Sequence, residues 1–249
     1  MKYRSFNIIL FFGFIITACM SSKKTVIIGH RGAKGHLAEN TLTSISKVIE
    51  LGVDGIEIDI FKCASGELVV FHDKTLEKLT NSTGYIEELV LDSIRRIEVL
   101  NGYSIPRLEE VLDLINGRVF LNIELKGSAT ALKTDEVLQV YFEGEAWFPE
   151  KILISSFNWD ELKIFRQINK EVPIAILTED DPLDAIPIGL ELKAKAINPD
   201  FKTLNSINVA KIHKADFKVF PWTVNKIDNI AIMKSLGVDG IITDFPEKI

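Results

Sequence analysis

The sequence predicts an α/β fold in which eight parallel strands close into a barrel. After residue 25, short apolar segments rich in β-branched residues alternate with longer amphipathic segments, the pattern of β-α units around a parallel sheet. Eight such apolar segments can be recognised, which is the strand number of an α/β barrel. Roughly 230 residues remain after the N-terminal segment, compact for a barrel of typically about 250.

The expected strands and helices follow one another in regular order. The strands are centred on Ile27, Ile58, Leu121, Ile154, Ile174, Ile197, Val219 and Ile241. The helices are expected over residues 42–51, 108–115, 134–148, 159–168, 183–192, 205–215 and 226–236. Asn225 is expected to cap the last helix and Gly237 to end it. The helix at 183–192 is the least favourable because it contains Pro187 and Gly189.

Residues 61–101 do not fit a simple β-α repeat. They hold an apolar strand that ends on His72, a turn signal at 80–84 and a short amphipathic stretch at 89–97. A structureless loop of this length is uncommon in a compact domain, so this segment is expected to have structure of its own.

Charged side chains stand at or near the ends of the expected strands. His30 and Arg31 close the first strand, and a buried pair of this kind needs an anionic partner. Glu57 and Asp59 are two residues apart, which places both carboxylates on one face of the second strand. Glu124 and Lys126 share a face of a later strand in the same way, and His72 ends another apolar strand. Together these residues suit one shared site.

The residue types indicate acid-base chemistry on an anionic group. Three converging carboxylates repel one another unless a cation joins them, and an all-oxygen ligand set favours Ca²⁺ or Mg²⁺. Imidazole transfers protons near neutral pH, and guanidinium holds phosphate or carboxylate with parallel hydrogen bonds. The alternative for Glu57, Asp59 and Glu124 is an ion-pair network with Lys126 and Arg31. His36 and His213 have no such neighbours and receive no role.

The chain resembles the glycerophosphodiester phosphodiesterases, whose motifs occur here in family order over nearly everything after residue 25. The matching segments are His30-Arg31-Gly32, Glu39-Asn40-Thr41, Gly55–Asp59, Val69–Asp73, Ile105-Pro106, Leu108–Leu112, Glu124–Lys126, Trp222–Asn225 and Gly237–Asp244. The resemblance implies a TIM (β/α)8 barrel over residues 25–249, with a small insertion after the second strand, at about 61–101, that covers the substrate.

The resemblance also implies the roles of the site residues. Glu57, Asp59 and Glu124 would hold one divalent cation, Ca²⁺ or Mg²⁺, while Arg31 and Lys126 would bind the substrate phosphate. His30 and His72 would be the general acid and base, in an order left open. Two further residues would belong to the substrate pocket: Trp222, which could instead be a barrel-core residue, and Glu39. The family usually has Pro before Glu39, and Ala38 in its place predicts a looser loop.

The expected activity is metal-dependent hydrolysis of glycerophosphodiesters to glycerol 3-phosphate and an alcohol. In related enzymes a substrate hydroxyl is thought to attack first, and water then opens the cyclic phosphate. Two alternatives stay open: a non-catalytic lipoprotein that binds glycerophosphodiesters, and a lysophospholipase-D-like activity on the same barrel. Binding alone would not require both histidines. The leaving alcohol and the oligomeric state are not predicted.

Composition and the N-terminus bear on the partners. A net charge of −6 argues against nucleic acid. Lys2 and Arg4 precede an apolar run at 6–16, as in a bacterial signal segment over residues 1–19. Residues 16–19, Ile-Thr-Ala-Cys, resemble a lipobox, so Cys19 is expected to be lipidated and followed by a tether at 20–24. A lipid anchor would place the protein at the membrane of a bacterial cell envelope, on the extracytoplasmic side. The alternatives are a soluble secreted protein and an uncleaved anchor. Cys63 is expected to be a small residue at the edge of the core.

Overall fold

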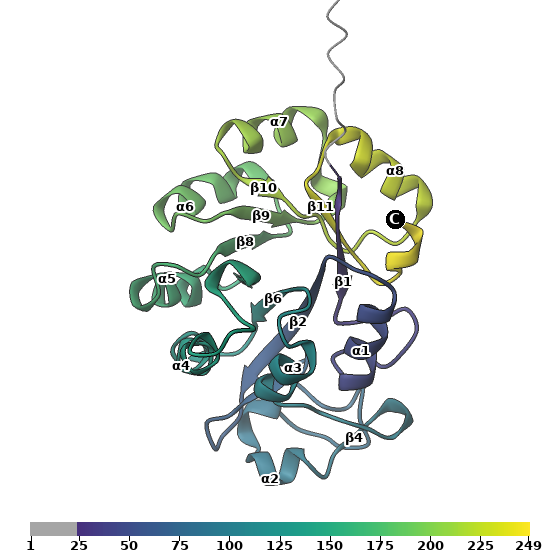
Figure 1. Cartoon of the computed structure of the whole chain (residues 1–249), viewed down its shortest axis with the longest axis vertical. Coiled ribbons are helices and arrows are strands. Elements are labelled where there is room, and N and C mark those ends of the chain that lie inside the picture. The colour runs from purple at the N-terminus through teal and green to yellow at the C-terminus, as the bar shows by residue number, and fades with distance from the viewer. Residues whose placement is uncertain (1–23) are drawn as a thin grey trace, which may run out of the picture.

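The computed structural model describes residues 24–249, which form an eight-stranded parallel barrel surrounded by helices (Figure 1). The barrel strands are β1 (Val26–His30), β2 (Gly55–Lys62), β6 (Phe120–Leu125), β7 (Ile152–Ser156), β8 (Ile174–Thr178), β9 (Ala196–Pro199), β10 (Lys218–Val219) and β11 (Gly240–Thr243). The helices around them are α1 (Leu42–Glu50), α3 (Leu108–Ile115), α4 (Thr130–Phe142), α5 (Trp159–Ile168), α6 (Ala185–Glu191), α7 (Ser206–Lys214) and α8 (Ile227–Leu236). Each of the eight expected strand centres lies within one of these strands.

Neighbouring barrel strands pair in parallel from β10 through β9, β8, β7, β6, β2 and β1 to β11. The remaining gap, between β10 and β11, is bridged by backbone hydrogen bonds. The amide of Asp239 donates to the carbonyl of Val219 and that of Ile242 to Pro221, both at 3.0 Å. The predicted α/β barrel is therefore confirmed, with its least regular seam at the last strand pair.

The insertion after β2 is also confirmed and has its own small core. β3 (Leu68–Val70) pairs antiparallel with β2, and α2 (Leu91–Ile94) and the hairpin of β4 (Glu98–Val99) with β5 (Tyr103–Ser104) follow. Apolar side chains from these segments, among them Phe61 and Ile94, form a cluster separate from the main core. Cys63 lies buried in this cluster, as expected. In Figure 1 the insertion, with α2 and β4, lies at the bottom of the picture beyond α1 and α3.

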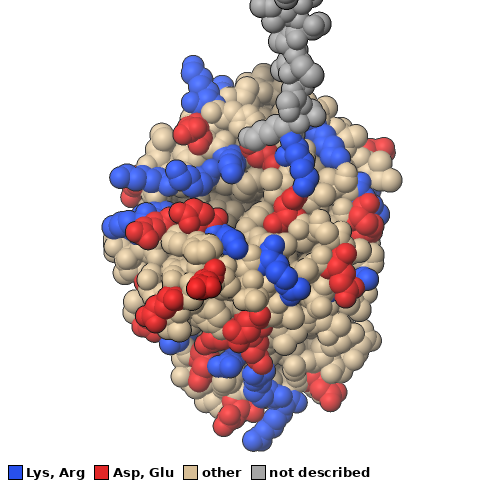
Figure 2. All heavy atoms as spheres, in the orientation of Figure 1, with Lys and Arg blue, Asp and Glu red and all other residues tan. Residues whose placement is uncertain are grey.

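Side chains alternate across the barrel wall and so divide its interior from the main core. Ile56, Ile58 and Ile60 of β2 pack outward under the helices, whereas the residues between them point inward. The barrel interior contains an apolar plug, which is formed by Ile28, Leu153, Ala175, Ala196, Phe220 and Ile242. Acidic and basic side chains are interspersed over the outer face drawn in Figure 2. Among residues 24–249, no helix has the length and apolarity needed to span a membrane.

Two sequence expectations about helix ends are wrong. The helix expected at 134–148 is α4, which begins at Thr130 and ends at Phe142, before Gly144. Asn225 does not cap α8, because its side chain binds Asp244 instead and α8 begins after Lys226 without a side-chain cap. Gly237 ends α8 in the left-handed conformation, as expected (φ +76°).

The early start of α4 is explained by a carboxylate from the next helix. Residue Ala129, which precedes α4, has no side chain able to cap it. Glu161 of α5 is buried and accepts hydrogen bonds from the amides of Ala129 (2.8 Å) and Ala131 (2.9 Å) and from the Thr130 hydroxyl (3.2 Å). This carboxylate satisfies the first turn of α4 and fixes the loop that follows β6.

Replacing Glu161 by Ala should therefore lower the free energy of unfolding by about 3 kcal/mol, because the buried amide of Ala131, the part-buried amide of Ala129 and the Thr130 hydroxyl lose their acceptor. Urea unfolding measures the loss. Glu136→Ala is the matched control, since Glu136 is exposed on α4 and makes only an i,i+3 pair with Lys133. Equal losses in the two variants would contradict the capping role.

Candidate active site

The expected site residues come together at the carboxyl ends of the barrel strands. Strand register places His30 of β1 beside Glu57 of β2, and Asp59 of β2 beside Glu124 of β6. His72 reaches the same cavity from the segment after β3. The cavity has a volume of about 370 Å³ and is lined by His30, Arg31, Glu57, His72, Glu124, Lys126 and Trp222, among others.

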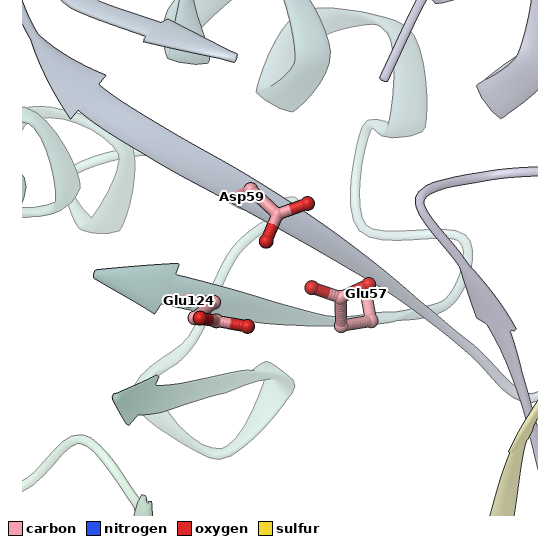
Figure 3. A group of neighbouring side chains, drawn as sticks. All are labelled: Glu57, Asp59 and Glu124. Carbon is pink, nitrogen blue, oxygen red and sulfur yellow. The ribbon is translucent and has the colours of Figure 1, made fainter. Parts of the chain in front are cut away.

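Three carboxylates from β2 and β6 point toward one another at this cavity (Figure 3). Glu57, Asp59 and Glu124 are buried, and one oxygen of each lies within 4.8 Å of the others. Within the described chain, Oε1 of Glu57 and Oδ1 of Asp59 are buried without a hydrogen-bond partner. Buried oxygens with free lone pairs at this spacing could hold a metal ion.

The protonation of these carboxyls reflects their crowding. Burial, and then the charges of Asp59 and Glu124, raise the pKa of Glu57 well above its ordinary value. Burial and the charge of Asp59 raise the pKa of Glu124 to about 7. Burial acts in the same direction on Asp59, but the nearby Arg31, His72 and Lys126 outweigh it and lower its pKa. The positive side chains around the cluster therefore do not fully compensate the negative charge of the three carboxylates.

Two cations border the carboxylates. Arg31 binds Glu39 (Nη1 to Oε1, 2.6 Å) and Asp59 (Nε to Oδ2, 3.2 Å). Lys126 donates to Oε1 of Glu124 (2.9 Å) and lies 3.9 Å from Asp59. Although burial opposes it, the charges of Glu124 and Asp59 raise the pKa of Lys126, so this ammonium group stays charged. Both the ion-pair network and the metal-compatible cluster that the sequence allowed are therefore present in one site.

Each of the two histidines is held by a carboxylate. Nδ1 of His30 lies 2.7 Å from Asp244, and its Nε2 faces Glu57 at 3.9 Å. Nδ1 of His72 lies 2.5 Å from Asp73, and its Nε2 lies 3.2 Å from Nζ of Lys126. Burial lowers the pKa of both imidazoles. Both rings therefore present Nε2 to the charged centre of the site, and burial favours their neutral form.

Sequence reasoning missed the residues that hold these groups in place. Asp244 is itself oriented by Asn225, whose Nδ2 donates to Oδ2 of Asp244 at 2.7 Å. Asn40 donates to Oδ2 of Asp59 at 2.9 Å. Asp73 could have been found from its position next to His72, and the other three lie in the motifs already quoted. Only the fold shows which partner each of them contacts.

The structure also shows where the two expected pocket residues, Glu39 and Trp222, lie. Although Ala38 precedes it, Glu39 is firmly held, because Arg31 binds one carboxylate oxygen and Lys34 lies 3.3 Å from the other. Trp222 lines the cavity and packs edge to face against Phe157, with ring centroids 5.4 Å apart.

His36 and His213 lie outside this cavity. They pair instead with Glu247 and Asp239 respectively.

Comparison with known proteins places this site in a family. Residues 30–248 match the glycerophosphoryl diester phosphodiesterase family. A glycerophosphodiester phosphodiesterase from Caldanaerobacter subterraneus subsp. tengcongensis is 33% identical, over 91% of this chain and 96% of the relative. An Oleispira antarctica phosphodiesterase, solved in complex with the product sn-glycerol-3-phosphate, superposes with a TM-score of 0.82 at 25% identity, covering 90% of this chain and 94% of that one.

A similar likeness is found to a structure from Silicibacter pomeroyi that is described as a putative glycerophosphoryl diester phosphodiesterase. Its TM-score is 0.78 at 28% identity, over 90% of this chain and 91% of that one. The match to the family model extends from the first site histidine almost to the C-terminus, and the fold and the relatives agree with it. The chain therefore belongs to the glycerophosphoryl diester phosphodiesterase family.

Proposed function

We propose that this protein hydrolyses glycerophosphodiesters to glycerol 3-phosphate and an alcohol. The observation that carries the proposal is the cavity that brings two carboxylate-held histidines to a carboxylate cluster and two buried cations. A protein that only bound the diester would need the charged groups but not two imidazoles, each oriented through Nδ1. The Caldanaerobacter relative is named a glycerophosphodiester phosphodiesterase, and the Oleispira structure holds the product sn-glycerol-3-phosphate, which supports the proposal.

The carboxylates Glu57, Asp59 and Glu124 are the proposed ligands of one divalent cation. The unpartnered oxygens of Glu57 and Asp59 and the raised pKa values of the two glutamates fit a hard ion such as Ca²⁺ or Mg²⁺. When bound, this ion would neutralise charge that develops on the phosphoryl oxygens.

Arg31 and Lys126 are the proposed phosphate-binding residues. Both are largely buried and border the carboxylates, with their side chains 12% and 18% exposed. Glu39, Asp59 and Glu124 hold them in fixed positions, so little reorientation is needed when an anion arrives. In this way the two cations would orient the diester between the two imidazoles.

His30 and His72 are the proposed general base and general acid. One imidazole, in its neutral form, accepts the proton of the attacking hydroxyl at Nε2, and the other, in its imidazolium form, donates the Nε2 proton to the oxygen of the leaving alcohol. Asp244 and Asp73 fix the opposite nitrogen, Nδ1, and stabilise the imidazolium form of each ring. Asn225 acts by positioning Asp244, and Asn40 acts by positioning Asp59.

We further propose that the protein is a lipoprotein of a bacterial cell envelope. The signal segment at 1–19, the lipidation site Cys19 and most of the tether at 20–24 lie outside the described residues. The support is the sequence: a charged start, an apolar run and a lipobox. β1 begins at Val26, two positions after the last residue of the proposed tether.

Metal removal should stop turnover, and it should also change stability with pH in a defined direction. In the metal-free protein the Glu124 carboxyl keeps its proton up to about pH 7, whereas the unfolded chain releases it near 4.5. The folded state therefore binds more protons in this window, and stability falls as the pH rises through it. Ca²⁺ or Mg²⁺ should raise the melting temperature more at about pH 7.5 than at about pH 5.

Thermal unfolding with chelator and with each ion measures this shift, and a turnover assay under the same conditions accompanies it. Glu124→Gln is the matched variant, because it removes the titrating group and should weaken both the pH dependence and the shift caused by the metal. Full turnover in excess chelator, with no metal in the protein, would overturn the cation proposal.

Replacing either His30 or His72 by Ala should slow the chemical step by about a hundredfold or more, with a much smaller loss of affinity. Arg31→Ala should differ by weakening phosphate binding as well as turnover. Single-turnover rates and ligand affinities separate the two effects, and Gln in place of each histidine keeps polarity without titration. Wild-type rates in the histidine variants would refute the proton-transfer roles. A wild-type protein that binds but never hydrolyses glycerophosphodiesters would favour the binding alternative.

Cys19→Ser should abolish lipidation and leave the precursor uncleaved, because the modified residue itself defines the cleavage position. Mass spectrometry of the N-terminal peptide and detergent-phase partitioning measure both outcomes. A wild-type protein without an acyl group at Cys19 that stays in the aqueous phase would exclude the lipid anchor.

A further inference from the structure

Three buried polar side chains line the barrel interior beside the carboxylates and the apolar plug: strand register pairs Asn122 with Glu57 and Leu153, and Ser155 with Glu124. Asn122, Ser155 and Asn198 each line the active-site cavity and are at most 1% exposed. Ser155 and Asn198 stand one inward position beyond the plug residues Leu153 and Ala196 on their strands. Because inward positions alternate along a strand, Ser155 and Asn198 point into the barrel next to the plug, and we call these two residues and Asn122 the polar floor of the cavity.

This floor has hydrogen-bonding capacity that the described chain does not use. Nδ2 of Asn122 donates to the hydroxyl of Ser155 at 2.9 Å, but its Oδ1 has no partner. In Asn198 both Nδ2 and Oδ1 are buried without a partner in the part of the chain that the structure describes. Leaving a whole amide unpaired is costly, so the position is suited to a polar group that enters the cavity.

The chemistry of an amide favours one part of the substrate. Asn198 offers a donor and an acceptor side by side, which matches a hydroxyl group because a hydroxyl also donates and accepts. The phosphate has only acceptor oxygens at neutral pH, and Arg31 and Lys126 already serve it. The variable leaving alcohol needs the open mouth of the cavity, whereas the glycerol end is the same in every substrate and suits the polar floor next to the plug.

We propose that Asn198 is a specificity-determining residue that binds the terminal hydroxyl of the glycerol moiety, with Asn122 and Ser155 completing the polar floor. The inference rests on the proposed function and adds a substrate rule to it. A diester whose alcohol lacks that hydroxyl would leave the Asn198 amide unpaired and would be rejected. A site built to bind a hydroxyl discriminates strongly against an analogue without it.

The test compares glycerophosphocholine with its propane-1,2-diol analogue. The analogue lacks only the terminal hydroxyl and keeps the hydroxyl next to the phosphoester carbon, so an attack by that group stays possible. The wild-type protein, with metal present, should show kcat/KM lower by about a hundredfold or more for the analogue. Asn198→Leu, which is close in size and apolar, should lose activity on glycerophosphocholine and treat the two substrates within about threefold of each other.

Leu177→Met is the matched control, since Leu177 lines the same wall and is paired in register with Asn198. It should keep the wild-type ratio between the two substrates. Equal rates for the two substrates in the wild-type protein would overturn the proposal even if Asn198→Leu fails to fold. An unchanged ratio in folded Asn198→Leu would also overturn it, and would indicate that the Asn198 amide of the wild-type protein binds water instead of the substrate. No hydrolysis of glycerophosphocholine by the wild type would instead count against the proposed function.

Discussion

The repulsion among three buried carboxylates is the constraint on which the rest of the site depends. Glu57, Asp59 and Glu124 approach within 4.8 Å in a place that water barely reaches. Isolated charges at this spacing would not stay ionised, and the raised pKa values of the two glutamates express that cost. Arg31 and Lys126 offset only part of the negative charge. A strongly charged ligand that completes the balance is the simplest way to make such a cluster stable.

The same electrostatic logic explains the arrangement around the cluster. Each histidine has its own carboxylate, so its orientation does not depend on the three shared ones. Separating these roles matters because an imidazole bound directly to the cluster would compete with the cations. Asn225 and Asn40 contribute neutral hydrogen bonds, which fix Asp244 and Asp59 without adding charge. Asn225 and Asn40 thus hold Asp244 and Asp59 in place at little electrostatic cost.

Local sequence patterns predicted the parts of the molecule that depend on neighbours close in the chain. The eight strands followed from apolar runs, and the shared face of Glu57 and Asp59 followed from a spacing of two. The missed parts are contacts between distant segments. Glu161 sets the start of α4 from the next helix, and Asp244 holds His30 across 214 positions of sequence. Asn225 was assigned to a cap because its local signal fits one, but the barrel offers it the stronger, charged partner.

The barrel reconciles a polar site with a stable fold by changing composition along its axis. The apolar plug of Ile28, Leu153, Phe220 and their neighbours closes the interior, and inward positions become polar toward the carboxyl ends of the strands. Alternation lets this happen without disturbing the outward side chains, which bury against the helices throughout. Stability therefore comes from the outer core and the plug, while the last inward positions of β6, β7 and β9 carry polar groups: Glu124, Ser155 and Asn198. That division is why the same strands can hold both the core and a site whose hydrogen bonds only a ligand completes.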